Sequence, residues 1–301
     1  MKYERILAAV HDEIWAIRET KLQAILDFLA QQAAGVKFSA EDIEARISKQ
    51  DEREVARRDG AVAILPLRGV IANRMSMMGD ISGGTSNEGF GKAFRAALAD
   101  EGVKALVIDV DSPGGSVSGT DELASMIFAA RGGAKPIVAH VNASAHSAAY
   151  WIASAADELV VTPSGSVGSI GVFGVHDDVS GAMEKLGVRK TLISAGKFKT
   201  AGNPFEPLGD EARSRIQARV DAHYDMFVRA VARNRGVSLQ TVRDGFGQGD
   251  IVGAEAAVAE RMADRVATLE ETLQRFGASQ FAAPTKRRAS ALARERAALS
   301  L

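Results

Sequence analysis

Ser147 is the residue best suited, by type and position, to act as a nucleophile. It stands in the run SAHSAAYW (144–151), where a predicted strand ends and a predicted helix begins. The start of a helix favours a developing negative charge, and the small residues around the serine leave room for a substrate chain. Serine is also a common helix cap at such a position, so position alone leaves both roles open.

Two adjacent glycines, Gly114 and Gly115, follow another predicted strand in the run DSPGGS (111–116). Without a Cβ, they let the backbone turn sharply and bring its N–H groups close to a ligand. Such amides can form an oxyanion hole for the tetrahedral intermediate of acyl transfer. An ordinary turn between a strand and a helix is the alternative interpretation.

The run SAGKFKTAG (194–202) supplies two candidate general bases, Lys197 and Lys199. A lysine acts as a base only when its neutral form is accessible, which requires desolvation or a nearby positive charge. Lowering a lysine pKa to about 7–8 costs about 4 kcal/mol of folding free energy. Most loop lysines are simply solvated, so both interpretations stay open on the residues alone.

A Ser–His–Asp site is the other hydrolytic arrangement to consider, because His146 precedes Ser147. Neighbouring residues at a strand–helix junction point in different directions, so His146 is a poor partner for Ser147. A Ser–His–Asp site would resemble that of the Clp proteases, a resemblance that implies a histidine some two dozen residues after the serine. Here position 171 is glycine, and His176 lies beyond a glycine-rich predicted strand. The sequence therefore favours a lysine base over a histidine base.

The elements that must position these groups alternate between strand and helix, which predicts an α/β core of repeated βαβ units. Residues 3–34 show helical spacing, 40–49 predict a short helix, and the charged run 51–60 predicts a linker. We expect an N-terminal helical arm over 1–58, a catalytic domain over 59–276 and a flexible Ala/Arg-rich tail over 277–301. Strands are predicted around 61–71, 103–112, 135–145, 158–163 and 168–175. Helices are predicted over 89–98, 120–130, 148–156, 210–234 and 254–262.

Composition narrows the classes of function. The 301 residues carry a formal net charge of −1, which favours neither nucleic acid nor an acidic membrane as a partner. There is no cysteine, and the five histidines show no metal-ligand spacing, so we expect neither a metal nor another cofactor. Without an apolar leader or a run long enough to span a bilayer, a cytoplasmic protein is expected.

The order of the segments DSPGGS, SAAYWIASAADELVVTPSGSVGSIGV and GKFKTAGNPF, followed by the predicted helix at 210–234, resembles the signal peptide peptidase A family. The resemblance covers about residues 60–266 and implies a Clp/crotonase-like fold with a Ser–Lys dyad. It implies that Ser147 is the nucleophile and Lys199 the general base, with Lys197 as the rival. It also implies oxyanion donors at Gly114, Gly115 and the amide of Ala148.

Two departures from the family pattern affect small structural details. Ala148 and Ala149 stand where the family usually has two glycines, which narrows the backbone freedom but keeps both residues small. The usual Gly-Leu-Val-Asp near the end of the domain is here Arg-Met-Ala-Asp (261–264). Neither change removes a catalytic group.

The expected arm and the absence of a membrane anchor resemble the phage and prophage branch of this family, the head maturation proteases. That resemblance implies capsid and scaffold proteins as substrates, inside the prohead or the bacterial cytoplasm. It also implies a homo-oligomeric ring in which Ser147 and Lys199 meet across a subunit contact. A peptide-degrading protease, a crotonase-like acyl-CoA enzyme and a non-enzymatic scaffold protein are the alternatives.

Overall fold

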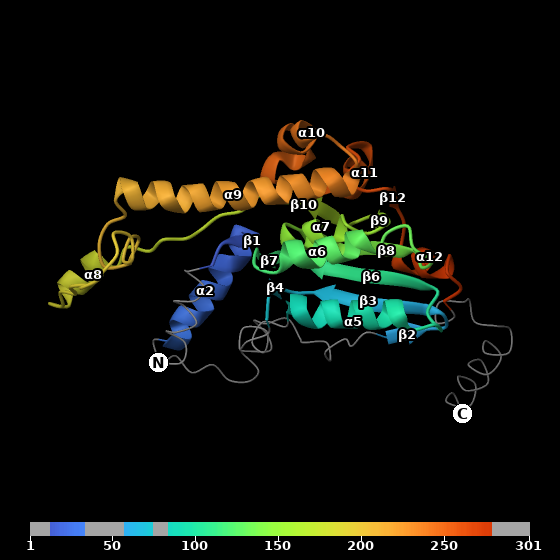
Figure 1. The fold of residues 1–301 in the computed structure, drawn as a ribbon, viewed down its shortest axis with the longest axis horizontal. Coiled ribbons are helices and arrows are strands. Elements are labelled where there is room, and N and C mark those ends of the chain that lie inside the picture. Colours follow the sequence, from blue (N-terminus) through green and yellow to red (C-terminus); the bar gives the residue numbers. More distant parts are fainter. Residues whose placement is uncertain (1–12, 34–56, 75–83, 279–301) are drawn as a thin grey trace, which may run out of the picture.

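The computed structural model describes residues 13–33, 57–74 and 84–278. Figure 1 shows an α/β core with helices packed about its sheets and a long helix extending beyond it. The strands are β1 Trp15–Ile17, β2 Arg57–Asp59, β3 Val62–Arg68, β4 Ile71–Ala72, β5 Thr85–Ser86, β6 Ala105–Ser112, β7 Gly114–Ser116, β8 Ile137–His146, β9 Glu158–Val161, β10 Ser166–Gly168, β11 Ile251–Gly253 and β12 Arg265–Val266. The helices are α2 Glu19–Ala33, α5 Asn87–Ala99, α6 Thr120–Ala129, α7 Ala148–Ala153, α8 Ser180–Lys185, α9 Asp210–Arg235, α10 Leu239–Asp244, the 3-10 turn η1 Phe246–Gly249, α11 Ala254–Ala259 and α12 Leu269–Gln274.

The main sheet has the strand order β11-β10-β8-β6-β3-β2, and β9 also pairs with β8. Its centre is parallel: β3 pairs with β6, and β6 pairs with β8. Seven of the eight residues of β6 are buried, as expected for a parallel strand that is covered on both faces. The parallel centre, with helices in the connections, confirms the predicted α/β core.

A smaller sheet, in the order β1-β7-β4-β5, lies at the end of β6. Strand β7 begins two residues after β6 ends, and it carries the two glycines of the DSPGGS run. Strand β1 pairs antiparallel with β7, whereas β4 pairs with it in parallel. The smaller sheet therefore brings the N-terminal part of the chain to the glycine turn.

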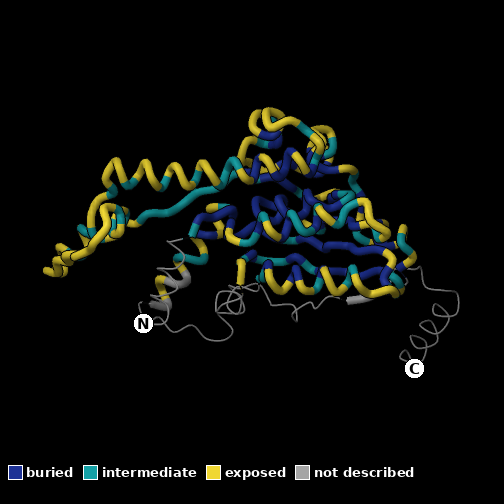
Figure 2. The backbone as a smooth tube through the Cα atoms, in the orientation of Figure 1, coloured by how far each residue is buried: buried dark blue, intermediate teal, exposed yellow. Residues whose placement is uncertain are grey.

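Helix α9 is buried against the core at its C-terminal end and exposed at its N-terminal end. Figure 2 shows dark blue, buried backbone throughout the layers around β6 and β8, whereas the end of α9 nearest α8 is mostly exposed. The buried residues of α9 lie between Phe227 and Asn234, and Phe227 stacks on Trp151 of α7 with ring centroids 4.4 Å apart. The predicted apolar face of α9 is thus buried only in its C-terminal part.

The predicted helices at 89–98, 120–130 and 210–234 are confirmed by α5, α6 and α9, within two residues at each end. Helices α7 and α11 are confirmed but are three residues shorter than predicted. The predicted strand at 168–175 is wrong for most of its length: β10 ends at Gly168, and beyond it only Phe173 forms an isolated bridge, to Trp15.

The predicted helix at 3–34 is confirmed for Glu19–Ala33 and wrong for Trp15–Ile17, which form strand β1. Pairing with β7 outweighs helical spacing here because it buries all three residues of β1. The linker predicted at 51–60 is wrong for Arg57–Asp59, which form strand β2 along β3. The helix predicted at 40–49 and nearly all of the tail lie outside the described residues.

Strand β8 contains a buried histidine that couples stability to pH. His140 is fully buried, and its Nδ1 lies 3.0 Å from Thr272 Oγ1. Burial, assisted by the positive charge of Arg265, lowers the pKa of His140 to about 4. Between that value and the ordinary pKa of about 6.5, the unfolded chain binds more protons than the folded one. The free energy of unfolding therefore falls as the pH drops through this window.

We predict that His140→Gln reduces this pH dependence by up to about 3 kcal/mol between pH 7 and pH 4, because one pKa unit corresponds to about 1.4 kcal/mol. Urea unfolding at a series of pH values measures the effect. The wild-type protein, unfolded in the same buffers, is the reference. An unchanged slope in His140→Gln would contradict the prediction.

Candidate active site

Ser147 lies at the junction of β8 and α7 in a strained backbone conformation. Its φ is 57° and its ψ is −119°, in the left-handed half of backbone space that a residue with a Cβ rarely adopts. Its N–H donates to the Gly168 carbonyl at 2.7 Å, and the residue is only 1% exposed. Strain of this kind costs on the order of 1–3 kcal/mol and is concentrated at functional sites. The conformation matches the sharp turn between strand and helix that presents a nucleophile.

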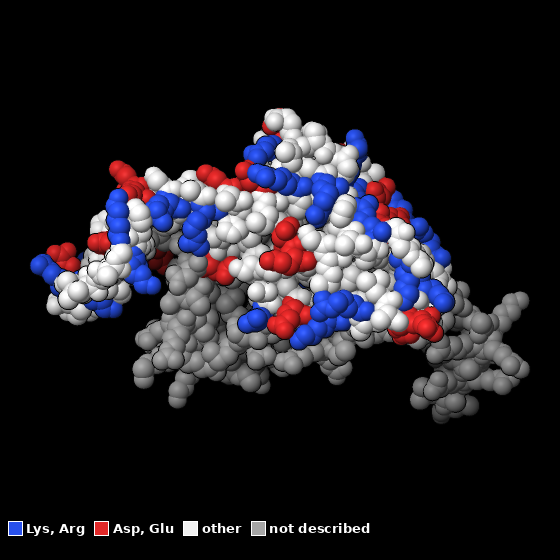
Figure 3. Space-filling view, in the orientation of Figure 1, with Lys and Arg blue, Asp and Glu red and all other residues white. Residues whose placement is uncertain are grey.

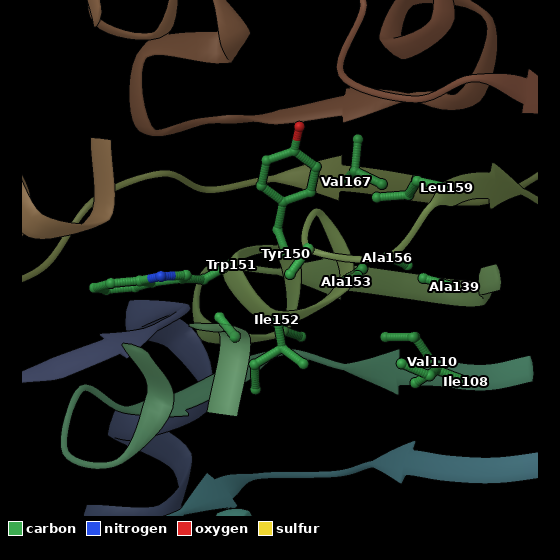
Figure 4. Close-up of a cluster of buried hydrophobic side chains, with 14 of the residues drawn as sticks. Ile108, Val110, Ala139, Tyr150, Trp151, Ile152, Ala153, Ala156, Leu159 and Val167 are labelled. Atoms are coloured by element: carbon green, nitrogen blue, oxygen red, sulfur yellow. The ribbon is translucent and has the colours of Figure 1, made fainter. Parts of the chain in front are cut away.

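Helix α7 is held firmly behind Ser147. All six of its residues are buried, and Figure 4 shows Tyr150, Trp151 and Ile152 leaving the helix in different directions among buried side chains. The Tyr150 hydroxyl donates to the Met262 carbonyl at 3.0 Å, and Trp151 stacks on Phe227 of α9. This packing supports the strained turn, since a turn at the end of a loose helix would relax.

The glycine turn of β7 packs directly against Ser147. Gly114 has φ 103°, and a Cβ at this position would stand 3.0 Å from the Ser147 Cβ. At Gly115 a Cβ would stand 1.8 Å from the Ile71 carbonyl oxygen of β4. Close approach of the backbone on both sides thus requires glycine at both positions.

The predicted oxyanion donors differ in their surroundings. The Gly114 N–H is engaged within its own turn, where it donates to Ser112 Oγ at 3.1 Å. Strand β1 lies between β7 and Phe173, in a place that we call the slot. Gly115 pairs with Ala16 of β1, so its N–H faces this slot. Ala148 is fully buried and is the first residue of α7, directly after Ser147. Gly115 and Ala148 are therefore the two amides that we retain as candidate donors.

The histidines have other partners. His146 Nε2 lies 2.9 Å from Ser166 Oγ, and burial, followed by the positive charge of Arg18, lowers its pKa to about 4. His176 Nε2 lies 3.2 Å from the carbonyl oxygen of Asn203, in the segment between α8 and α9. The Ser147 hydroxyl instead donates to the Gly171 carbonyl at 3.4 Å. This geometry gives no support to a Ser–His–Asp site.

The two candidate lysines lie between α8 and α9, at the end of α9 that is remote from α7 (Figure 1). Lys199 is exposed. Lys197 Nζ forms an ion pair with Glu211 at 2.7 Å and lies 4.7 Å from the centre of the Phe198 ring. On the face seen in Figure 3, blue and red side chains are interspersed at this end of the molecule. One chain thus brings together Ser147, Gly115 and Ala148, and it does not bring Lys199 to them.

Strand β1 is the part of the site that the sequence interpretation missed. It pairs with β7 beside Gly115, where helical spacing had predicted part of a helical arm packed on the core or on a neighbouring subunit. A signal was present: the run IWAI (14–17) is short, apolar and rich in β-branched and aromatic residues, which is typical of a strand. Charged residues on both sides of this run continue a spacing that is typical of a helix, so the whole of 3–34 is predicted as one helix.

Within the ranges 13–33, 57–74 and 84–278, no cluster of three or more His, Asp or Glu residues could hold a metal ion. In the same ranges, no helix has both the length and the apolar character needed to cross a bilayer.

The strain at Ser147 predicts an unusual order of stabilities. Because glycine adopts positive φ without a Cβ clash, Ser147→Gly should be more stable than Ser147→Ala by about 1 kcal/mol. At Ser144, in the extended strand β8, the order should reverse, since glycine costs about 0.5–1 kcal/mol relative to alanine in a strand. Chemical denaturation of the four variants measures both differences, and the same order at both positions would contradict the strain.

Comparison with known proteins places these features in a family. The model of peptidase family S49 matches residues 129–280, which is half of the chain. Head-tail preconnector protein GP5 of Enterobacteria phage P21 is 37% identical over 212 residues, covering 70% of this chain and 40% of the relative. Capsid assembly protease C of Escherichia phage lambda is 37% identical over 183 residues, covering 61% and 42%. The chain therefore spans about two fifths of the length of these two relatives.

Among solved structures, a ClpP1 mutant from Listeria monocytogenes is similar to 70% of this chain and 94% of its own, with 13% identity and a TM-score of 0.44. Protease 4 of Salmonella typhi is a further relative, 29% identical over 214 residues, covering 71% of this chain and 34% of that protein. From the matched family model and the order of its sequence segments, the chain is a member of peptidase family S49.

Proposed function

We propose that the protein is a serine endopeptidase in which Ser147 is the nucleophile and Lys199 of a neighbouring copy is the general base. The observation that carries this proposal is the strained, buried turn at Ser147, packed against the glycine turn of β7. A costly backbone conformation in a rigid core needs a compensating role, and presentation of a nucleophile is such a role. Membership of a peptidase family points to the same reaction.

The proposed reaction is acyl transfer. Ser147 Oγ attacks the carbonyl carbon of the peptide while the neutral amine of Lys199 accepts its proton. The amides of Gly115 and Ala148 stabilise the negative charge on the carbonyl oxygen. The protonated lysine then donates to the leaving amine, and water hydrolyses the acyl-enzyme ester by the reverse proton transfers.

A second copy of the chain is required because Lys199 is exposed and remote from Ser147 within one chain. Desolvation in a subunit contact would favour the neutral amine that a general base needs. The same part of the chain carries four exposed apolar side chains: Leu186 (75% exposed), Val188 (44%), Leu192 (46%) and Ile193 (97%). A surface of this kind is typical of an unoccupied protein contact. Assembly into a closed ring would cover it and bring Lys199 to the next copy of Ser147.

The substrates that we propose are phage capsid and scaffold proteins, cleaved during prohead maturation in the bacterial host. The names of two relatives, a capsid assembly protease and a head-tail preconnector protein, support this setting. The slot beside Gly115 accepts an extended strand, which suits an unfolded or flexible segment of such a protein.

Complementation between inactive variants tests the shared site. We predict that Ser147→Ala and Lys199→Ala are each inactive alone, and that a reassembled equal mixture recovers about a quarter of wild-type activity, because each functional site takes one group from each variant. Cleavage of a co-expressed capsid or scaffold protein, followed on gels, is the measurement. Lys197→Ala is the matched control and should stay active.

The mixture distinguishes the possible outcomes. An active wild type with no recovery in the mixture would contradict a shared dyad. An active Lys199→Ala with an inactive Lys197→Ala would transfer the role of base to Lys197. No cleavage by the wild type, of the phage proteins or of a generic peptide library, would favour a non-enzymatic scaffold protein.

A separate prediction concerns the four exposed apolar side chains between α8 and α9. Ile193→Asp places a charge on a side chain that is 97% exposed in one chain, so it should leave the fold of that chain intact. It should dissociate the assembly and reduce activity at least about 10-fold, because a buried unpaired charge in a contact costs several kcal/mol. Light scattering and peptide cleavage measure the two effects. Leu239→Asp, at an apolar residue on α10 that is 45% exposed, is the control. Equal assembly of Ile193→Asp and wild type would contradict this contact.

A further inference from the structure

Strand β1 is bonded along both of its edges, in a slot beside Ser147. On one edge, the Val117 N–H donates to the Ile14 carbonyl at 3.1 Å and the Arg18 N–H donates to the Pro113 carbonyl at 3.2 Å. On the other edge, Trp15 and Phe173 exchange N–H···O bonds of 2.9 and 3.0 Å. A peptide that adds to a sheet is held in the same way, by main-chain bonds on its edges.

The register places one carbonyl group of β1 at the candidate oxyanion hole. Hydrogen-bonded pairs alternate along an antiparallel ladder, and the bonded contacts of Ile14 and Arg18 make Ala16 and Gly115 the bonded pair between them. The Gly115 N–H therefore faces the Ala16 carbonyl. A Cβ on Gly114 would stand 2.3 Å from the Ala16 oxygen and 3.0 Å from the Ser147 Cβ, so all three groups meet at one point.

The side chains of β1 fill specific places. Ile14 and Ala16 belong to the main core cluster, whereas Trp15 and Ile17 belong to a second cluster with Leu22 and Val70. This alternation between two faces is that of an extended strand. Ala16 is fully buried, and the Ile14 Cδ1 comes within 3.3 Å of the position of a Cβ on Gly174. The place beside Ser147 is thus filled by a methyl group, and larger apolar groups fill its neighbours.

We propose that β1 is an internal substrate: it occupies the peptide-binding slot, and the enzyme cleaves its own Ala16–Ile17 bond. The inference rests on the proposed role of Ser147 as nucleophile. Ser147 Oγ forms an ester with the Ala16 carbonyl carbon while Lys199 of the neighbouring copy takes the hydroxyl proton. The C–N bond breaks, the proton passes to the Ile17 amine, and water hydrolyses the ester to regenerate Ser147.

As an internal substrate, β1 blocks the enzyme until it is cleaved. Its residues also indicate which peptides the slot accepts. While β1 is in place, another peptide cannot pair with β7, so a single chain is blocked until assembly supplies the base. Cleavage frees the slot to accept other chains. Those chains should be extended, with alanine or another small residue before the cleaved bond and large apolar residues on both sides of it.

The test uses the assembled full-length protein and N-terminal sequencing with intact mass measurement. The wild type should acquire a new N-terminus beginning Ile17-Arg18-Glu19, and Ser147→Ala should remain uncut. Ala16→Leu should slow cleavage of this bond about 10-fold or more, because the added methylene groups do not fit the buried place of the methyl group. Ala24→Leu, at an exposed alanine of α2, is the matched control and should be cut like the wild type.

A peptide test covers the case in which Ala16→Leu fails to fold. A synthetic peptide with the sequence of residues 13–21 should be cut by the wild-type assembly between its Ala and Ile, and the same peptide with Ala16→Leu should be cut about 10-fold or more slowly. If the wild type cleaves a generic protein substrate but leaves Ala16–Ile17 intact in both chain and peptide, the internal-substrate proposal is overturned and the peptidase proposal stands. If it cleaves nothing, both are overturned.

Discussion

The turn at Ser147 packs against the glycine turn of β7, and both turns hold a residue at positive φ. Ser147 adopts φ 57° only because β8 ends in the sheet and α7 is buried at once behind it. The stacking of Trp151 on Phe227 then ties α7 to α9. A strained residue persists where its surroundings hold it from several sides, and here the core does so.

The same arrangement explains why the two proposed catalytic groups, Ser147 and Lys199, lie in separate parts of the chain. The C-terminal part of α9 is fixed to the core through Phe227 and Val231, while its N-terminal part extends away with α8 and Lys199 beside it. A helix of this length holds the segment with Lys199 away from Ser147 of the same chain, and in the proposed assembly it brings that segment to a neighbouring copy. The apolar residues around Ile193 make that exposed end suited to protein contact. Assembly and activation of the base are thus one event in the proposed mechanism.

The sequence predicted the parts of the fold whose signals are local. The run ALVIDV of β6 is almost wholly apolar because both faces of a parallel strand are covered, and α5, α6 and α9 have clear helical spacing. The resemblance to a peptidase family, carried by the order of several segments, was confirmed by the family match. The roles of Ser147 and Lys199 remain predictions, since one chain leaves them apart.

What the sequence could not show depends on contacts between distant segments. Strand β1 forms because β7 and Phe173 offer two edges to it, and no spacing within residues 13–17 reveals those partners. The engagement of the Gly114 N–H by Ser112 likewise follows from the fold of the turn, so the residues alone could not separate Gly114 from Gly115 as a donor. Tertiary pairing decides where β1 forms, and the choice between Gly114 and Gly115 as donor stays a prediction.

Covalent labelling distinguishes a nucleophilic Ser147 activated by Lys199 from a serine that is only buried. A peptidyl phosphonate ester with an alanine-like group at phosphorus reacts irreversibly with an activated serine, and digestion with mass spectrometry locates the adduct. We expect a single adduct on Ser147 of the assembled wild type and none on the Lys199→Ala assembly. An adduct on another serine, or equal labelling of Ser147 without Lys199, would contradict it.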